Sequence, residues 1–127
     1  MEIRPHVLRT PEDCFAELPD YDFAPHYLEI VDEQLGALRM HYLDEGGRQA
    51  PVVLLLHGNP AWSYLYRHMI EPLVKAGCRV VVPDIIGFGK SDKPARRSDY
   101  GFDRFVAWTT AFVEELKLSD ITLVVQD

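Results

Sequence analysis

Three short apolar runs, rich in β-branched residues, occur along the chain at residues 52–56, 78–82 and 121–125. They are continuous and do not alternate with polar residues, which indicates strands buried on both faces, as in a parallel sheet. The third run leads into Gln126 and Asp127, so a carboxylate directly follows the strand. A carboxylate at the end of a central strand must be solvated, must cap a helix or must take part in chemistry.

Two alternating segments precede these runs. Residues 27–31 and 38–43 alternate apolar and polar side chains, and residues 32–36 between them include a glycine and three polar residues. Alternation with a period of two is typical of strands with one buried face. The pattern therefore predicts an antiparallel pair of strands joined by a turn.

Two segments between the apolar runs have helical periodicity. The stronger one begins at Phe102, and its apolar or semi-polar positions recur every three or four residues. The other starts at Trp62, and Pro72 is expected to end or kink it near Ile70, with a second short piece over residues 72–76. Strand, helix, strand, helix and strand in this order predict an α/β fold. We expect a mostly parallel sheet with right-handed crossovers, preceded by the antiparallel hairpin.

The first part of the chain follows neither pattern. It contains four prolines and scattered aromatic residues, which predicts an extended arm over residues 1–25 and no helix or sheet. Residues 26–127 are then the N-terminal portion of one α/β core domain. If the chain ended at Asp127, its last strand would be an exposed apolar edge. We therefore expect the fold to continue beyond this residue.

The composition argues against some classes of binding partner but does not indicate which reaction the protein could catalyse. The net charge of −7 and the lack of a Lys/Arg cluster argue against nucleic acid or an anionic membrane, because both need a basic face. The charged first residues do not form a signal sequence, and no apolar run approaches the roughly 18 residues of a membrane span, so a cytoplasmic protein is expected. Cys14 and Cys78 are far apart and form no zinc motif. No metal and no cofactor is predicted.

Two loops follow the carboxyl ends of buried strands: residues 57–62 (HGNPAW) and the turn that begins at Asp127. Parallel neighbouring strands would bring these loops together, where ligands bind in open α/β sheets. A glycine-containing turn with free backbone N–H groups beside a nucleophile has the geometry of an oxyanion hole. Such N–H donors would keep the Asp127 carboxylate ionised and able to attack carbon. Alternatively, Asp127 only caps the next helix.

Three motifs in this order resemble the haloalkane dehalogenases of the α/β-hydrolase superfamily. They are residues 57–67 (HGNPAWSYLYR), residues 83–94 (PDIIGFGKSDKP) and residues 123–127 (LVVQD). The first two also resemble epoxide hydrolases, but the spacing, with Asp and not Ser at the strand-to-helix turn, is typical of the branch with an Asp nucleophile. The resemblance implies an α/β-hydrolase fold, of which this chain is the N-terminal part through the nucleophile strand.

The resemblance also implies roles for two residues. Asp127 would displace halide from a haloalkane and form an alkyl-enzyme ester. Water would hydrolyse this ester to a primary alcohol, activated by a His that the family places later in the chain. The backbone N–H of Asn59, with that of the residue after Asp127, would help to hold the oxyanion, and the Asn59 side chain would face the cavity. In one branch of the family an Asn there helps a Trp to bind halide, and in another branch the position is a Glu while two Trp side chains bind halide, so Asn59 leaves the branch undecided. The implied enzyme is a cofactor-free monomer that takes a small halogenated substrate and water and releases halide.

Several assignments have alternatives. Trp62 is a candidate for the pocket wall, although a Trp that opens an amphipathic helix also fits the core. His57 fits a residue that orders the turn better than one that titrates in the mechanism. Asp84 is expected to fix its loop by pairing with Lys93 or Arg97. An epoxide hydrolase that uses the same Asp and a non-catalytic ligand-binding relative are the two rival functions.

Overall fold

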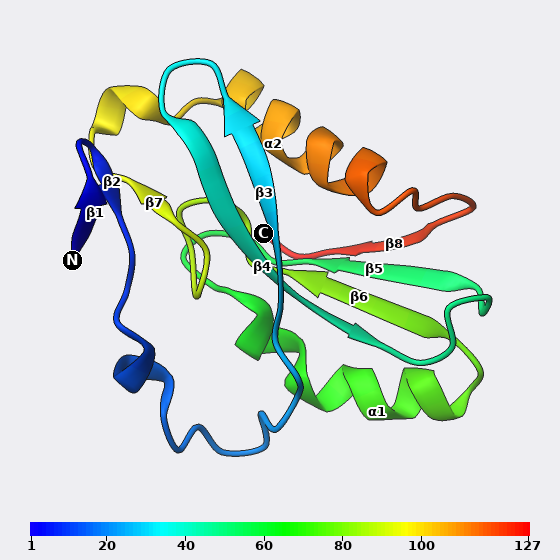
Figure 1. Ribbon diagram of the computed structural model, residues 1–127. Helices are drawn as coiled ribbons and strands as arrows, with labels where there is room; N and C mark the ends of the chain where they lie inside the picture. The colour runs from blue at the N-terminus through cyan, green and yellow to red at the C-terminus, as the bar shows by residue number, and fades with distance from the viewer.

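The computed structural model describes residues 1–127. Its centre is a five-stranded mixed sheet in the order β3-β4-β6-β5-β8, with one helix packed on each face (Figure 1). The strands are β3 (His26–Asp32), β4 (Gly36–Glu45), β5 (Val52–Leu56), β6 (Arg79–Pro83) and β8 (Thr122–Val125). The helices are α1 (Arg67–Lys75) and α2 (Phe102–Glu115), and the 3₁₀ turns are η1 (Glu12–Phe15), η2 (Ser63–Tyr66) and η3 (Arg97–Asp99).

The predicted hairpin at the start of the sheet is confirmed. β3 and β4 run antiparallel along the whole of β3. The Asp32 carboxylate accepts the N–H groups of Gln34 and Leu35, at 2.9 and 3.0 Å, and Gly36 has a left-handed conformation with φ of 79°. A side-chain acceptor followed by a glycine is a common way to set such a turn.

The parallel part of the sheet consists of β6, β5 and β8. β5 lies in the middle and runs parallel to both neighbours, whereas β4 runs antiparallel to β6. Successive residues of β5 face opposite sides: Leu54 belongs to the core with Phe112 of α2, and Leu55 belongs to the core with Ile70 of α1. Burial on both faces explains why this run is apolar without alternation, as the sequence predicts.

The prediction for the helix after β5 is wrong in one respect. η2 leads into α1, which continues through Pro72 to Lys75 without a break. Pro72 cannot donate a helical hydrogen bond, but its carbonyl oxygen accepts the N–H of Ala76 at 3.1 Å, and Ile70 in the preceding turn is buried against the sheet. Tertiary packing of the apolar face therefore keeps the segment helical where the local rule predicts an interruption.

The first residues also differ from their prediction. A small antiparallel sheet contains β1 (Glu2–Arg4), β2 (Val7–Leu8) and β7 (Lys93–Pro94), with β2 paired to both β1 and β7, and it lies beside the main sheet in Figure 1. Strands of two or three residues have no readable periodicity, and β7 comes from a distant loop, so local sequence could not reveal this sheet. The division into an arm of residues 1–25 and a core of residues 26–127 stays a prediction.

β8 is the strand that leads to Asp127, and it lies at an edge of the sheet. It runs parallel to β5, as predicted, with Leu54 opposite Leu123. Within residues 1–127, Leu123 and Val125 are 54% and 65% exposed, and the burial of β8 on both faces stays a prediction for the complete protein. Burial of a strand needs neighbours on both sides and helices over both faces, and β8 has β5 as its only strand neighbour.

Candidate functional site

The two candidate loops meet at the carboxyl ends of β5 and β8. The parallel register pairs Leu56 with Val125, so His57 and Gln126 begin the following segments side by side. A Cβ atom on Gly58 would lie 2.2 Å from the carbonyl carbon of Asp127. Only a glycine allows the two backbones to approach this closely. The sequence position of Gly58 is thus explained by its contact with Asp127.

The turn between Gly58 and Ala61 is held by its own backbone and by His57. Ala61 donates its N–H to the carbonyl oxygen of Gly58 at 2.8 Å, and the peptide bond between Asn59 and Pro60 is cis. His57 Nδ1 lies 3.0 Å from the same Gly58 oxygen, and Nε2 accepts the N–H of Ile85 at 3.0 Å. These contacts define an ordered turn, residues 58–61, that carries Asn59 at the candidate site.

His57 itself is buried and suited to order the turn in its neutral form. Burial lowers its pKa below the ordinary value of 6.5, and this effect outweighs the hydrogen bond to Gly58 and the charge of Asp84, which both act to raise the pKa. A neutral imidazole with Nδ1 protonated leaves Nε2 free to accept from Ile85. This geometry agrees with the interpretation of His57 as a residue that orders the turn.

The loop after β6 supports the turn through Asp84, which is fully buried. Its carboxylate accepts the N–H of Ser63 at 2.7 Å and the N–H of Lys90 at 2.9 Å, and it lies 2.8 Å from His41 Nδ1. Burial alone would raise the pKa of Asp84, but the hydrogen bonds and the interaction with His41 outweigh it and hold the pKa below its ordinary value. Asp84 is therefore a buried, ionised carboxylate with a full set of donors.

The expected partners of Asp84 are wrong. Lys93 Nζ donates to the carbonyl oxygens of Gly89 and Ser91, and Arg97 lies in η3 at the start of a separate turn. The actual partner, His41 of β4, was missed by the sequence reasoning because it lies on the strand face opposite the apolar positions that define β4. Its complete burial shows that this face of β4 is covered as well.

A cavity of about 180 Å³ lies next to Asn59. It is lined by the turn after β5, by the loop after β6 and by α2, through His57, Gly58, Asn59, Ile85, Phe88 and Phe105. The ring centroids of His57 and Phe88 are 5.1 Å apart in an edge-to-face arrangement. The cavity therefore combines an apolar wall with the His57 ring and the Asn59 amide, which suits a small and mostly apolar ligand, and Asp127 is not among its lining residues.

Trp62, the candidate for the pocket wall, lies in an aromatic cluster with residues of the first part of the chain. Its ring centroid is 5.4 Å from that of Phe15, 5.3 Å from Tyr21 and 5.6 Å from Tyr64. Trp62 does not line the cavity beside Asn59. The structure thus gives Trp62 a packing role between η2 and the arm, and its predicted contact with a ligand stays a prediction.

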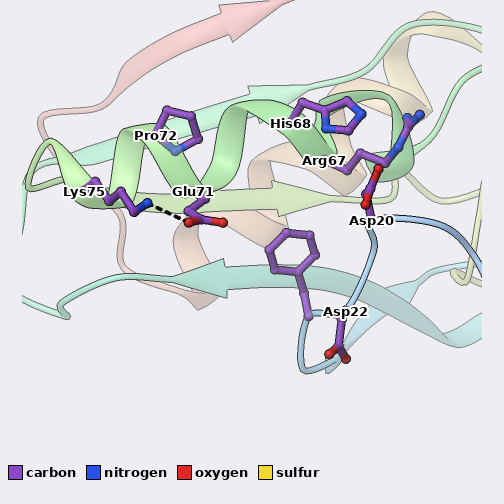
Figure 2. A pocket seen from close by; sticks show the side chains of 8 residues that line it. Asp20, Asp22, Arg67, His68, Glu71, Pro72 and Lys75 are labelled. Atoms are coloured by element: carbon purple, nitrogen blue, oxygen red, sulfur yellow. Dashed lines mark ion pairs between the residues drawn. The ribbon is translucent and has the colours of Figure 1, made fainter.

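The largest hollow of the surface lies elsewhere, between α1 and the segment around Asp20 (Figure 2). Its volume is about 610 Å³, and Figure 2 shows charged side chains of both signs along it, among them the ion pair between Glu71 and Lys75 at 2.8 Å. Neither Asn59 nor Asp127 borders it. Size alone therefore does not locate the candidate site, whereas the meeting of the two strand ends does.

Three further observations concern metal binding, the two cysteines and membrane insertion. No group of three or more His, Cys, Asp or Glu side chains is placed to bind a metal ion. Cys14 and Cys78 are free thiols. None of the helices has the length and apolar character needed to cross a bilayer.

Comparison with known families decides the fold. The family described as alpha/beta hydrolase fold matches residues 51–127. The chain belongs to the alpha/beta hydrolase fold family. This assignment confirms the fold implied by the three sequence motifs, with the sheet mixed and an antiparallel hairpin at its start.

Curated relatives of this alpha/beta hydrolase chain are haloalkane dehalogenases. The haloalkane dehalogenase of Mycolicibacterium paratuberculosis is 57% identical over 122 residues, and that of Psychrobacter cryohalolentis is 56% identical over 121 residues. These matches cover 96% and 95% of this chain but 40% of each relative. The chain thus spans about two fifths of the length of the curated relatives it matches.

Similar solved structures include both haloalkane dehalogenases and epoxide hydrolases. The tetrameric structure of haloalkane dehalogenase DpaA from Paraglaciecola agarilytica NO2 has a TM-score of 0.89 and 45% identity, covering 95% of this chain and 40% of DpaA. Epoxide hydrolase VrEH1 from Vigna radiata has a TM-score of 0.68 and 31% identity, covering 81% of this chain and 32% of VrEH1. The chain is therefore more similar to DpaA than to VrEH1, whereas haloalkane dehalogenase DatA from Agrobacterium tumefaciens C58, with a TM-score of 0.67 and 31% identity over 82% of this chain and 33% of DatA, is about as similar as VrEH1. The predicted monomer stays a prediction beside a relative that is tetrameric.

Proposed function

We propose that the protein that carries this chain is a hydrolytic haloalkane dehalogenase, with Asp127 as nucleophile and Asn59 in the oxyanion hole. The backbone contact between Gly58 and Asp127 supports this most directly, because it sets the N–H-bearing turn 58–61 against the carboxylate residue. The relatives that are 57% and 56% identical are dehalogenases, which supports the choice of reaction.

In the proposed reaction, an Asp127 carboxylate oxygen attacks the carbon that bears the halogen. The new C–O bond forms as the C–halogen bond breaks, and halide leaves with the bonding electron pair. Water then adds to Cγ of the Asp127 ester as a base takes its proton. The bond between Cγ and the alkoxy oxygen breaks, the leaving alkoxide takes the proton back from that base, and the alcohol and the Asp127 carboxylate are released. During this second step the carbonyl oxygen becomes an oxyanion, which the N–H of Asn59 would stabilise.

The cavity beside Asn59 supports a small apolar substrate. Phe88, Phe105 and Ile85 provide apolar wall, and the amide of Asn59 is the polar side chain that could donate to a departing halide. An epoxide hydrolase would use the same Asp127 to open a strained ring, and it stays the second candidate because epoxide hydrolases share this fold at 31% identity. A cytoplasmic location and a contact of Trp62 with substrate belong to the proposal as well.

Halide release by the complete protein tests the proposal. A panel of 1-haloalkanes, a dihaloalkane and a set of terminal epoxides is offered, and halide and diol are measured separately. Halide release with little diol is the expected result. Diol formation without halide release would favour the epoxide hydrolase, and no turnover of either class would favour a ligand-binding protein.

Substitution of Asp127 and isotope labelling test the nucleophile. Asp127→Asn keeps the size but removes the charge, so halide release should fall by at least about a thousandfold while the fold is retained. If Asp127 only capped a helix, Asn would cap it equally well and activity would survive. A single turnover in ¹⁸O-labelled water should place label in the Asp127 carboxylate. Label that appears only in the first product alcohol would show direct attack by water and would contradict the nucleophile assignment.

A further inference from the structure

The loop after β6 contains two aspartates, Asp84 and Asp92, that are both fully buried. Asp92 forms two hydrogen bonds with Arg9, at 2.6 and 2.9 Å, and accepts the N–H of Arg39 at 2.8 Å. These contacts tie the loop to the arm and to β4. Asp84 differs because one of its donors, the N–H of Ser63, belongs to the segment that carries the candidate oxyanion turn. Two similar carboxylates therefore have different partners.

Two consecutive residues of this loop hold both ends of the turn 58–61. Ile85 donates its N–H to His57 Nε2 at 3.0 Å, immediately before the turn. Asp84 accepts the N–H of Ser63 at 2.7 Å, two residues after the turn. Asn59 lies between these two attachment points. A displacement of residues 84–85 would therefore be transmitted to Asn59 from both sides.

The contacts of Asp84 need a carboxylate and not merely a polar side chain. Oδ1 accepts from Ser63, while Oδ2 accepts from Lys90 and lies 2.8 Å from His41 Nδ1. An amide has a single oxygen, so its NH₂ group would face one of these backbone N–H donors. The surroundings are also tight, because a Cβ on Gly89 would lie 2.5 Å from the Asp84 carboxyl carbon. The site thus has little space in which a substituted side chain could relax.

We propose that Asp84 is a positioning residue that fixes the oxyanion turn 58–61 through the amide of Ser63, with His41 holding the carboxylate from β4. The catalytic consequence rests on the proposed function, whereas the effect on the turn does not. Oxyanion donors act only when they are held about 2.7–3.1 Å from the developing charge. A shift of about 1 Å in such a group can lower the rate by roughly a hundredfold.

The first experiment compares Asp84→Asn with Asp92→Asn in the complete protein. Each change removes one fully buried charge from the same loop, so Asp92→Asn is the matched control. Hydrogen exchange of the Ala61 amide reports on the turn whatever the substrate, because this N–H closes the turn on Gly58. We expect exchange of Ala61 to be at least about tenfold faster in Asp84→Asn and unchanged in Asp92→Asn. Equal exchange in the two variants would overturn the proposal.

Kinetics give the second readout. With the two variants compared at the same interval below their own melting temperatures, Asp84→Asn should lower kcat for halide release by about a hundredfold with KM changed much less. Asp92→Asn should leave both near the wild-type values. A general loss of stability would lower both variants together, which would contradict positioning. If the wild type releases no halide but Ala61 still exchanges faster in Asp84→Asn, the proposed function fails and the positioning role stands.

A second pair of variants applies if Asp84→Asn does not fold. Ser63→Pro removes the N–H that Asp84 accepts, and Ser63 is the first residue of η2, where proline is tolerated. Ser63→Ala is its control, because both changes remove the hydroxyl and only the proline removes the N–H. Faster Ala61 exchange and a lower kcat are expected in Ser63→Pro relative to Ser63→Ala. Identical behaviour of this pair would overturn the role of the Ser63 amide.

Discussion

β5 and β8 are neighbouring parallel strands of similar composition, and each leads into one half of the candidate site. They pair Leu54 with Leu123, yet Leu54 is 3% exposed and Leu123 is 54% exposed. The segment after β5 is held by hydrogen bonds from Ile85 and to Asp84, whereas β8 has one strand neighbour. Within residues 1–127, the same kind of apolar run thus has strand neighbours on both sides in β5 and on one side in β8.

This difference shows how the candidate site is organised. The turn 58–61 is fixed by its own backbone and by the loop after β6, so its N–H groups are held in place in advance. Asp127 reaches this turn from the end of β8, through the contact with Gly58. Preorganised donors lower the cost of stabilising charge during a reaction. The β5 side therefore supplies the rigid part of the site.

Among the changes that test the comparison of β5 with β8, the largest effect is expected where the two strand ends touch. In Gly58→Ala, the new Cβ would lie 2.2 Å from the Asp127 carbonyl carbon and 2.4 Å from the Gln126 oxygen, so the backbones must separate. Halide release by the complete protein should fall by about a hundredfold, and overpacking should cost about 1–3 kcal/mol of stability. Steady-state kinetics and thermal unfolding measure the two effects.

Gly47→Ala is the control for this change. Gly47 lies in the loop before β5, and a Cβ there would meet only the Cβ of Ala50 at 3.9 Å, an ordinary contact. Its kinetics should match the wild type. If Gly58→Ala were equally harmless, the close contact between the strand ends would not matter for activity.

The difference in burial between β5 and β8 predicts a difference in how well their backbone amides are protected from hydrogen exchange. In a sample of residues 1–127, amides of β8 should exchange at least about tenfold faster than those of β5, because an edge strand opens without disturbing the core. The exposed Leu123 and Val125 should also make thermal unfolding broad. Hydrogen exchange followed by mass spectrometry measures the first effect and calorimetry the second. Uniform protection with a sharp two-state transition would contradict both.

The smallest effect concerns how the free energy of unfolding depends on pH through His57, which directly follows β5. The pKa of His57 is lowered by burial, so below its ordinary value of 6.5 the unfolded chain takes up a proton that the folded chain does not. The free energy of unfolding should therefore decrease as the pH falls below about 6.5, by at most about 1.4 kcal/mol per pH unit from this group. The decrease ends below the folded-state pKa.

His57→Gln separates this contribution from that of other groups. A Gln oxygen can still accept the N–H of Ile85 but does not titrate, so the variant should lose this part of the pH dependence. Denaturant unfolding of the complete protein between pH 7.5 and 5 gives the comparison. Identical pH profiles for wild type and variant would show that His57 does not resist protonation in the folded state.

Local sequence was sufficient to predict the strands and helices whose apolar residues follow a clear pattern along the chain. Alternation predicted the hairpin, and continuous apolar runs predicted β5 and β6, because the side chains of these strands report directly on which faces are buried. The periodicity from Phe102 predicted α2 in the same way. It failed at Pro72, where packing of Ile70 outweighs a missing hydrogen bond, and at the small sheet, where β1 and β2 are too short to show a period and β7 pairs with the distant β2.

The sequence by itself also determined which functional groups are available for chemistry. These are a carboxylate directly after an apolar strand, and a turn with a glycine followed by Asn59. The tertiary structure alone decided that Gly58 touches Asp127, and that Asp84 pairs with His41 and Ser63 and not with Lys93 or Arg97. The reason is physical. Periodicity records which face of an element is covered, whereas the identity of a contact partner depends on sheet order and loop paths, which bring together residues that are distant in the chain.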